Sequence, residues 1–383
     1  MRSIARDLIL ILNEPARDYM AGGNVREYAL VEWAKRRGAE VWVVRDAHFE
    51  SSRSARVLAL PRLLARIWRR RGAVVILGYP GFPFFWSMDS VPQLMRTFLF
   101  VAGMKIVGLV RRLVIVVDIM DLPRYQHIDL HYHVGLPNWL HKLFDRCVYH
   151  LATRLWVCSQ GIGDCIRDEM LWGRDRAVTV ENGAFPSRYD CLGNGSGHAP
   201  RTFIYAGQLF ETRGVPELIE EFSRSRRDDV ELRLCGTGGE WLPGRLDDPR
   251  IKYLGHLDEQ DCARAVAESE VGIVFQPDGP YYDMVYPTKL PLYLARGKPV
   301  IATDNRELAR SVKEMGVGVV VSRDGIAAAI DELTAESMSA YAPKVFGANA
   351  RTSVYWDSIY DRAYSELVGH PGPDAEEGGH AGD

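Results

Sequence analysis

Short apolar segments alternate with longer amphipathic segments along most of the chain, and this alternation constrains the fold more than any other sequence feature. In the second half, residues 231–234, 271–275 and 318–321 are apolar segments of strand length. The segments between them, such as residues 215–225, repeat their apolar side chains with helical spacing. Strands that alternate with helices form a parallel sheet covered by helices on both faces. We therefore predict a doubly wound α/β domain.

The first half repeats this pattern and begins with an almost wholly apolar segment at residues 7–13. A strand without polar alternation is typical of a parallel sheet that is buried on both faces. A helical segment at 25–37 and a second strand at 40–44 complete a right-handed βαβ unit. The predicted fold class is thus α/β, with two doubly wound Rossmann-like domains that face each other across a cleft.

A stretch rich in Gly, Ser, Asn and Pro between residues 186 and 201 indicates an interdomain linker. The last 15 residues are rich in Gly, Pro and acidic side chains, so we expect them to be disordered. The predicted boundaries are 1–190 for the first domain, 191–200 for the linker, 201–351 for the second domain, 352–368 for a helix that crosses back to the first domain, and 369–383 for the tail.

The net charge of −3 over 383 residues conceals opposite charges on the two halves. Residues 1–200 contain 27 basic and 19 acidic side chains, whereas residues 201–383 contain 20 basic and 31 acidic ones. The basic half suits an anionic surface or an anionic acceptor, and we expect no nucleic-acid partner. The six cysteines form no C-x-x-C pair and join no His cluster, so we expect no metal site and no disulfide framework. The expected location is the cytoplasm, at the inner face of the membrane if the basic half binds there.

The segment at 286–303, YPTKLPLYLARGKPVIAT, predicts a short loop, a helix and a buried strand. Pro287 suits the first helical position, and Gly297 ends the helix. The free N–H groups of a helix N-terminus attract anions such as a pyrophosphate. Most α/β proteins contain helices of this kind, so the segment alone does not distinguish a binding site from an ordinary helix.

Three loops of the second half follow predicted strands, and each is expected to face the cleft. They span residues 207–214, 235–239 and 278–289. The first two are rich in glycine, and the first and third contain Arg213 and Lys289 at helix starts. Glycine-rich turns with cations at helix starts suit a diphosphate.

Six short motifs occur along the chain in a specific order. The second half contains GQLFETRG at 207–214, CGTGGE at 235–240, YLGHL at 253–257 and the segment at 286–303. The first half contains AGGNVREYAL at 21–30 and TVENG at 179–183. Together they resemble the large retaining family of GT-B glycosyltransferases (glycosyltransferase family 4-like, group 1), which includes sucrose synthases, mannosyltransferases and bacterial polysaccharide enzymes. The resemblance covers nearly the whole chain and implies a transferase that uses a nucleotide diphosphate-sugar donor.

The resemblance implies that the second domain binds the donor. Arg213 stands where family members contact the donor pyrophosphate, and Gln208 stands where many members have a second Arg. Gly22 and Gly23 would let the backbone approach the donor across the cleft. The implied donor-binding residues are Gly22, Gly23, Gly207, Gln208, Arg213, Gly236, Asp283, Tyr286, Pro287, Thr288, Lys289 and Leu292.

Three positions depart from the family pattern. Leu292 occupies the place of a Glu that usually binds the nucleotide ribose, so ribose binding has to come from elsewhere. Asp283 is a candidate for the earlier acidic residue of that spaced pair, although its offset is one residue too long. Met120 replaces a His in the segment 118–121, which resembles the family's Asp-x-His-Asp strand end.

The retaining reaction of this family needs few protein groups and neither a metal nor a cofactor. The leaving diphosphate can accept the acceptor's proton while cations offset its growing charge, which is the expected role of Arg213 and Lys289. A carboxylate can stabilise an oxocarbenium-like state; Asp118 is the first candidate and Asp121 the second. The alternative for both is that they bond the next loop at a strand end.

The sequence leaves the acceptor open among a glycan, a lipid-linked glycan and a small molecule. His127 and His131 are candidate acceptor contacts. The alternation of His131 and His133 is typical of a metal pair on a strand, but no third ligand of matching spacing appears. We therefore expect no metal there.

A candidate membrane-surface patch combines the basic residues 69–71 and 111–112 with Trp68, Trp86 and the apolar segment 91–110. The longest charge-free run of that segment is too short to span a bilayer. For the segment itself we favour the other interpretation, a core helix with a partly exposed basic rim.

Two other functions are compatible with this architecture. A non-hydrolysing nucleotide-sugar epimerase would interconvert a nucleotide sugar without an acceptor. A degenerate, non-catalytic protein of the same fold would act as a binding partner, and Leu292 and Met120 favour that alternative.

Overall fold

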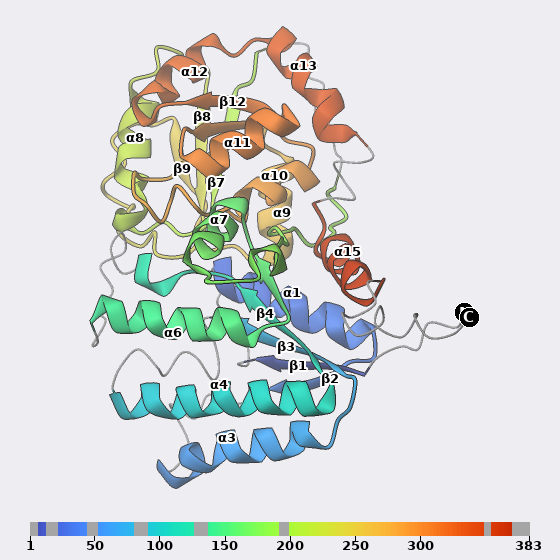
Figure 1. The fold of residues 1–383 in the computed structure, drawn as a ribbon. Coiled ribbons are helices and arrows are strands. Elements are labelled where there is room, and N and C mark those ends of the chain that lie inside the picture. Colours follow the sequence, from blue (N-terminus) through green and yellow to red (C-terminus); the bar gives the residue numbers. More distant parts are fainter. Residues whose placement is uncertain are drawn as a thin grey trace.

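The computed structural model describes residues 7–12, 22–43, 53–79, 91–125, 137–190, 199–347 and 354–369. These residues form two six-stranded sheets, one in each half of the chain. The two sheets lie in separate lobes, each surrounded by its own helices (Figure 1). This architecture confirms the predicted α/β class with two doubly wound domains.

The elements follow each other in the alternating order that the sequence predicts. The first domain contains β1 (Leu8–Leu12), α1 (Gly22–Arg36), β2 (Glu40–Val43), α3 (Arg53–Trp68), β3 (Val74–Tyr79), α4 (Val91–Arg111), β4 (Val114–Ile119), α6 (Asn138–Leu151), β5 (Arg154–Val157), α7 (Gln160–Glu169), η2 (Arg174–Arg176) and β6 (Ala177–Thr179). The rest of the chain contains β7 (Thr202–Ala206), η3 (Glu211–Arg213), α8 (Val215–Ser223), β8 (Glu231–Cys235), β9 (Ile251–Tyr253), α9 (Glu259–Ala267), β10 (Val271–Val274), α10 (Lys289–Ala295), β11 (Val300–Thr303), α11 (Arg306–Met315), β12 (Gly318–Val321), η4 (Arg323–Gly325), α12 (Ile326–Glu332), α13 (Ala335–Phe346) and α15 (Trp356–Gly369).

The first sheet has the strand order β2-β1-β3-β4-β5-β6, and its neighbouring strands are parallel. Ile9 and Ile11 of β1 pack with α3, α4 and α6 on one face of the sheet. Leu8 and Leu10 pack with α1 and α15 on the other face. Because β1 is covered on both faces, its sequence has no polar alternation.

The second sheet has the strand order β12-β11-β10-β7-β8-β9 and is also parallel. Ile204 and Ala206 of β7 pack with α9, α10 and α11. Phe203 and Tyr205 of the same strand pack with α8 and α12. The strand β7, in the middle of this sheet, therefore separates two cores.

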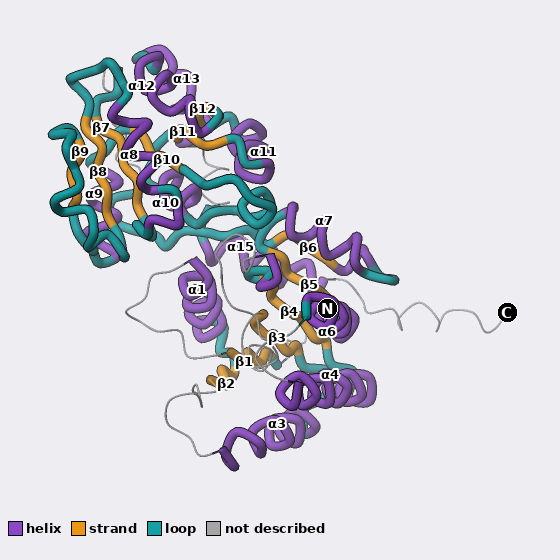
Figure 2. Tube along the Cα trace, turned by 90° about the vertical axis from the view of Figure 1, so that its left-hand side faces the viewer, coloured by secondary structure: helices purple, strands orange, loops and turns teal. Residues whose placement is uncertain are grey.

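Two segments of the second half pack onto the first domain. The helix α15 lies beside α1 in both views (Figure 1, Figure 2), where Trp33 Nε1 donates a hydrogen bond of 2.7 Å to Asp361. The loop that precedes α10 buries Tyr281, Tyr282 and Met284 in the core of the first domain. These contacts join the two lobes in addition to the linker, which lies mostly outside the described residues.

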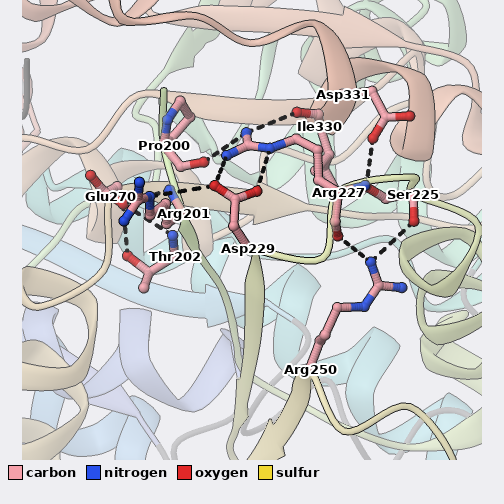
Figure 3. A network of polar contacts seen from close by, with 10 residues as sticks. All are labelled: Pro200, Arg201, Thr202, Ser225, Arg227, Asp229, Arg250, Glu270, Ile330 and Asp331. Carbon is pink, nitrogen blue, oxygen red and sulfur yellow. Dashed lines mark hydrogen bonds and ion pairs between the residues drawn. The ribbon is translucent and has the colours of Figure 1, made fainter. Parts of the chain in front are cut away.

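A polar network fixes the amino ends of the central strands of the second sheet (Figure 3). The Glu270 carboxylate accepts hydrogen bonds from the backbone N–H groups of Arg201 and Thr202, at 2.7 and 3.1 Å. Arg227 forms an ion pair of 2.9 Å with Asp229. Because ligands of parallel sheets bind at the carboxyl ends, this network lies at the end of the sheet away from the expected site.

Two helices differ from the sequence prediction. The helix α13 was not predicted from the sequence, and it contains Pro343. Thr334 nevertheless caps its first turn by accepting a hydrogen bond from the Ser337 N–H. The helix α1 begins at Gly22, so Gly22 and Gly23 lie in its first turn and not in the expected loop.

The helix α4 is amphipathic. Phe100 and Met104 are buried against the first sheet, whereas Leu99 and Ile106 are 69% and 60% exposed. The predicted core helix at 91–110 is therefore buried on one face, and its other face exposes apolar side chains. Within the described ranges, no helix is both long and apolar enough to cross a membrane.

Candidate functional site

A cavity of about 390 Å³ lies between the two domains, at the carboxyl ends of both sheets. The second domain contributes most of its walls through the loops after β7, β8 and β10 and the starts of α9 and α10. The first domain contributes Arg26, Met120, Asp121 and the segment 182–185. The predicted cleft between two doubly wound domains is therefore present, with loops of both domains in its lining.

Two glycine-rich loops of the second domain touch each other at the cavity wall. Gly207 and Gly236 have φ angles of 146° and 140°, which residues with a side chain rarely adopt. A Cβ atom on Gly236 would lie 1.7 Å from the carbonyl oxygen of Gly207. A Cβ atom on Gly207 would lie 2.7 Å from Cε of Lys289. Only glycines let these loops pack closely enough to place Lys289 against the wall.

Two cations, Arg213 and Lys289, line the same cavity. Arg213 ends the short helix η3, and the αL conformation of Gly214 (φ 76°) turns the chain into α8. The Lys289 ammonium group lies 4.5 Å from the centre of the Tyr205 ring. Burial, and then the charge of Arg213, lowers the pKa of Lys289 to about 7. Both side chains are cations, so an anion bound between them would be attracted by both and would relieve their mutual repulsion.

The start of α10 offers fewer free N–H groups than the sequence suggests. The helix begins at Lys289, one residue after its cap Thr288, and has only seven residues. The Leu290 N–H already donates to the carbonyl oxygen of Pro287 at 3.2 Å, and Pro291 has no N–H. Anion binding at this wall therefore depends mainly on the side chains of Arg213 and Lys289.

Asp118, the first candidate for the catalytic carboxylate, is buried beneath the cavity and not among its lining residues. It is fully buried and forms a two-point ion pair with Arg26, whose Nη2 and Nε donate at 2.6 and 3.1 Å. Arg26 also donates to the carbonyl oxygen of Val180 at 2.7 Å. Arg26 thus holds α1 against the ends of β4 and β6, and Asp118 is its buried partner and not a bond to the next loop.

Asp121, the second candidate, does line the cavity. The Tyr281 hydroxyl of the second domain donates a hydrogen bond of 2.9 Å to Asp121 Oδ1. Asp121 is therefore oriented by a side chain of the opposite domain. The structure favours Asp121 over Asp118 as the carboxylate that a bound ligand can reach.

The remaining predicted residues divide into two groups. Gly207, Gln208, Gly236 and the segment 286–289 line the cavity, and so does Leu292. Asp283 does not, because its carboxylate accepts a hydrogen bond of 3.1 Å from the Arg306 N–H at the start of α11. It therefore does not replace the acidic residue that is missing at Leu292. The candidate acceptor contacts His127 and His131 lie outside the described residues.

The lining residues that were not predicted from the sequence include Arg26, Asn182 and Arg296. Asn182 Nδ2 donates a hydrogen bond of 2.7 Å to the carbonyl oxygen of Tyr286, and its Oδ1 accepts one of 3.3 Å from Arg26. This connects the Asp118–Arg26 pair to the loop before α10. Arg26 and Asn182 lie within motifs that were recognised, but their contacts join residues more than 90 positions apart and leave no local signal.

The described residues hold no cluster of three or more His, Cys, Asp and Glu side chains with the arrangement of a metal site. The lining instead combines cations, carboxylates and several aromatic side chains; the cations are Arg26, Arg213, Lys289 and Arg296, and the carboxylates are Asp121, Asp258 and Glu259. Such a lining suits a ligand that carries both anionic groups and flat or apolar rings.

Comparison with known proteins supports the two-domain fold described above. A family model for the C-terminal domain of glucosyltransferase 3-like proteins matches residues 205–353. A curated relative from Xanthomonas oryzae pv. oryzae, a GDP-mannose:cellobiosyl-diphosphopolyprenol alpha-mannosyltransferase, is 22% identical over 247 residues. That match covers 62% of this chain and 63% of the relative.

Solved glycosyltransferase structures superpose on nearly the whole chain. HepE of Anabaena, in complex with UDP, gives a TM-score of 0.60 at 13% identity and covers 95% of this chain and all of its own. WaaG, a glycosyltransferase involved in lipopolysaccharide biosynthesis, gives a TM-score of 0.60 at 12% identity with the same coverage. The paired sheets and these superpositions show that the chain has the fold of GT-B glycosyltransferases, and its second half is similar to the C-terminal domain of glucosyltransferase 3-like proteins.

Proposed function

We propose that the protein transfers a sugar from a nucleotide diphosphate-sugar to a sugar-bearing acceptor, with retention of the anomeric configuration. One observation carries this proposal. Arg213 and Lys289 of one domain and Asp121 of the other line a single cavity. The two cations of the second domain can bind a diphosphate there. The Asp121 carboxylate of the first domain lines the same cavity, where it can act on the sugar.

The chemistry follows from charge. As the glycosidic bond breaks, negative charge grows on the departing diphosphate, and Arg213 and Lys289 offset that charge. The departing diphosphate takes the proton of the acceptor hydroxyl, which attacks the same face of the sugar. Asp121 stabilises the positive charge that develops on the sugar ring. Neither a metal nor a further cofactor is required, and the nucleotide sugar is a co-substrate.

For the acceptor we propose a lipid-linked glycan, as an intermediate in polysaccharide assembly. The relative from Xanthomonas is named for a cellobiosyl-diphosphopolyprenol acceptor. Its name contains GDP-mannose, whereas HepE was solved with UDP, so the comparisons leave the donor base open. A lipid-linked acceptor would place the protein at the cytoplasmic face of a membrane.

The surface of the first domain supports contact with an anionic membrane. Leu99, Ile106, Leu109 and Val110 of α4 are between 58% and 70% exposed. The guanidinium of Arg111, at the end of the same helix, lies 5.8 Å from the ring of Trp68. Exposed apolar side chains beside cations suit a membrane interface. Trp86, which was expected in this patch, lies outside the described residues.

The transfer reaction can be tested with purified protein, a panel of UDP-, GDP- and ADP-sugars, and polyprenyl-diphosphate glycans as acceptors. We expect one donor to be consumed only when an acceptor is present, and proton NMR of the product to show the anomeric configuration of the donor. Product of the opposite configuration would contradict retention. Conversion of the donor without acceptor would instead indicate an epimerase.

Membrane contact has a separate test. We expect the protein to sediment with anionic liposomes at low salt, and Ile106→Glu with Leu109→Glu to abolish sedimentation. Leu254→Glu is a matched control because Leu254 is 38% exposed on the second domain. Equal sedimentation of all three proteins, or none for the unmodified protein, would refute contact through α4.

A further inference from the structure

Arg296 is a buried cation whose hydrogen-bonding groups are incompletely used. Its residue exposure is 1%, and it lines the cavity. Within the described ranges, Nε and Nη1 have no hydrogen-bond partner. The nearest carboxylate oxygen, Asp190 Oδ1, is 3.6 Å from Nε, which is too far for a hydrogen bond. Buried donors without partners are costly, so a ligand that accepts from Arg296 would recover that cost.

The position of Arg296 relative to Lys289 indicates which part of a ligand it meets. Lys289, Leu292 and Arg296 follow one another at spacings of three and four residues, and all three line the cavity. Such spacing places them along one face of α10, over a length of about 10 Å at 1.5 Å per residue. A nucleoside diphosphate has a comparable length. With the diphosphate at Lys289, its ribose lies against Leu292 and its base reaches Arg296.

A carboxylate also lines the cavity near Arg296. Glu259 begins α9 and lines the cavity together with Cys262 of the same helix. Partial burial among the cavity residues raises the pKa of Glu259, and the charge of Arg296 opposes that rise, so the two charges interact. The base end of the cavity thus offers a cationic donor and a carboxylate acceptor.

Guanine matches this pair of groups. It presents two neighbouring acceptors, N7 and O6, which an arginine can contact at two points. Its next edge presents two donors, N1–H and the 2-amino group, which a carboxylate can accept. Adenine has an amino group in place of O6, and uracil has no second donor beside its N3–H.

We propose that the cavity selects a guanosine diphosphate donor, with Arg296 and Glu259 as the residues that read the base. This inference rests on the proposed function, because it assumes that the diphosphate binds at Arg213 and Lys289. Arg296 donates to O6 and N7, and Glu259 accepts from N1–H and the 2-amino group. The base contact also supplies binding that the missing acidic residue at Leu292 does not.

Isothermal titration of the full chain with GDP, UDP and ADP tests the base preference. We expect GDP to bind at least about tenfold more tightly than UDP or ADP, because a good two-point contact discriminates bases by roughly 5- to 150-fold. Equal affinities, or a preference for UDP or ADP, would overturn the inference and leave the proposed function intact. Failure of all three nucleotides to bind would instead contradict the proposed function itself.

Two variants test whether Arg296 is the residue that causes the preference for GDP over UDP. Arg296→Met should reduce the GDP preference over UDP to less than about threefold. Arg213→Met is the matched control, because it removes a cation of the same cavity at the diphosphate end. It should weaken GDP and UDP alike and leave their ratio unchanged. A GDP-to-UDP ratio that survives Arg296→Met would contradict the role of Arg296.

Glu259 can be tested even if Arg296→Met fails to fold, because Glu259 is an exposed residue and its replacement should not disturb the core. Inosine diphosphate retains N7, O6 and N1–H but lacks the 2-amino group. We expect the unmodified protein to bind GDP several-fold more tightly than inosine diphosphate, and Glu259→Gln to bring this ratio close to one. A ratio that Glu259→Gln leaves unchanged would overturn the assignment of the 2-amino contact.

Discussion

Among single residues, Lys289 is the one whose protonation should change when the donor binds. Its ammonium group lies against the face of Tyr205, and burial together with Arg213 lowers its pKa to about 7. A diphosphate between the two cations adds negative charge and therefore raises this pKa again. The lysine is thus partly neutral in the free protein at neutral pH and protonated in the complex.

We predict that nucleoside diphosphate binding at pH 8 takes up a proton and that affinity falls as the pH rises above 7. The sign follows because the free lysine has lost its proton above its pKa, whereas the bound lysine retains it. Titration calorimetry in buffers of different ionisation enthalpy measures the uptake. Lys289→Met should abolish it, and an equal uptake by the variant would exclude Lys289 as the group that titrates.

The two candidate carboxylates should separate by experiment. We predict that Asp118→Asn lowers the free energy of unfolding by about 3–5 kcal/mol, because it leaves the buried Arg26 charge without its partner. Asp121→Asn should lower turnover by roughly 10²–10³, the typical loss of one transition-state contact, with little change in stability. Urea unfolding and steady-state turnover of both variants decide the matter. The reverse pattern would restore Asp118 as the catalytic carboxylate.

At the scale of elements, helix ends are stabilised by side chains from outside the helix. Arg250 donates to the carbonyl oxygens of Ser223 and Ser225 at 3.1 and 3.0 Å, which belong to the end of α8, and pairs with Asp248 at 2.7 Å. Figure 3 shows this arginine beside the network at the amino ends of the strands. The network holds α8 without touching the cavity.

We predict that Arg250→Met lowers the free energy of unfolding by about 1–3 kcal/mol, because it leaves several carbonyl oxygens without donors. Affinity for nucleoside diphosphates should not change. Arg226→Met is a suitable control, since its side chain is 88% exposed and its surface ion pair with Asp331 contributes only about 0–1 kcal/mol. Equal loss in both variants would mean that the contacts to α8 contribute nothing.

The sequence predicts the elements well because their signals are local. Apolar segments predict each described strand, and glycines such as Gly297 mark helix ends. The site is predicted less well because its contacts are not local. Nothing near Asp118 in the sequence indicates that Arg26 neutralises it. Likewise, the spacing that leads to Asp283 does not show that its carboxylate bonds the first turn of α11.

For the whole molecule, the decisive feature is how the two domains are held around the cavity. Glu307 of α11 accepts hydrogen bonds of 3.0 and 3.1 Å from the N–H groups of Gln160 and Gly161, at the start of α7 in the other domain. A carboxylate at a helix N-terminus is favoured by the helix dipole. Tyr281 and Asp121 make a second contact across the cavity. Both contacts favour a closed arrangement.

We predict that Glu307→Ala opens the cleft. The radius of gyration from small-angle X-ray scattering should rise, and affinity for nucleoside diphosphates should fall. Glu314→Ala is the matched control, because Glu314 lies on the same helix and pairs with the same Arg310 but is 61% exposed. If both variants scatter like the unmodified protein, the carboxylate of Glu307 does not hold the domains together.

The proposed transfer reaction requires the cavity between the domains to bind a nucleotide diphosphate through Arg213 and Lys289. A crystal structure of the protein with GDP tests it most directly. We expect the diphosphate within hydrogen-bond distance of both cations and the base beside Arg296. A diphosphate bound away from Arg213 and Lys289 would contradict it.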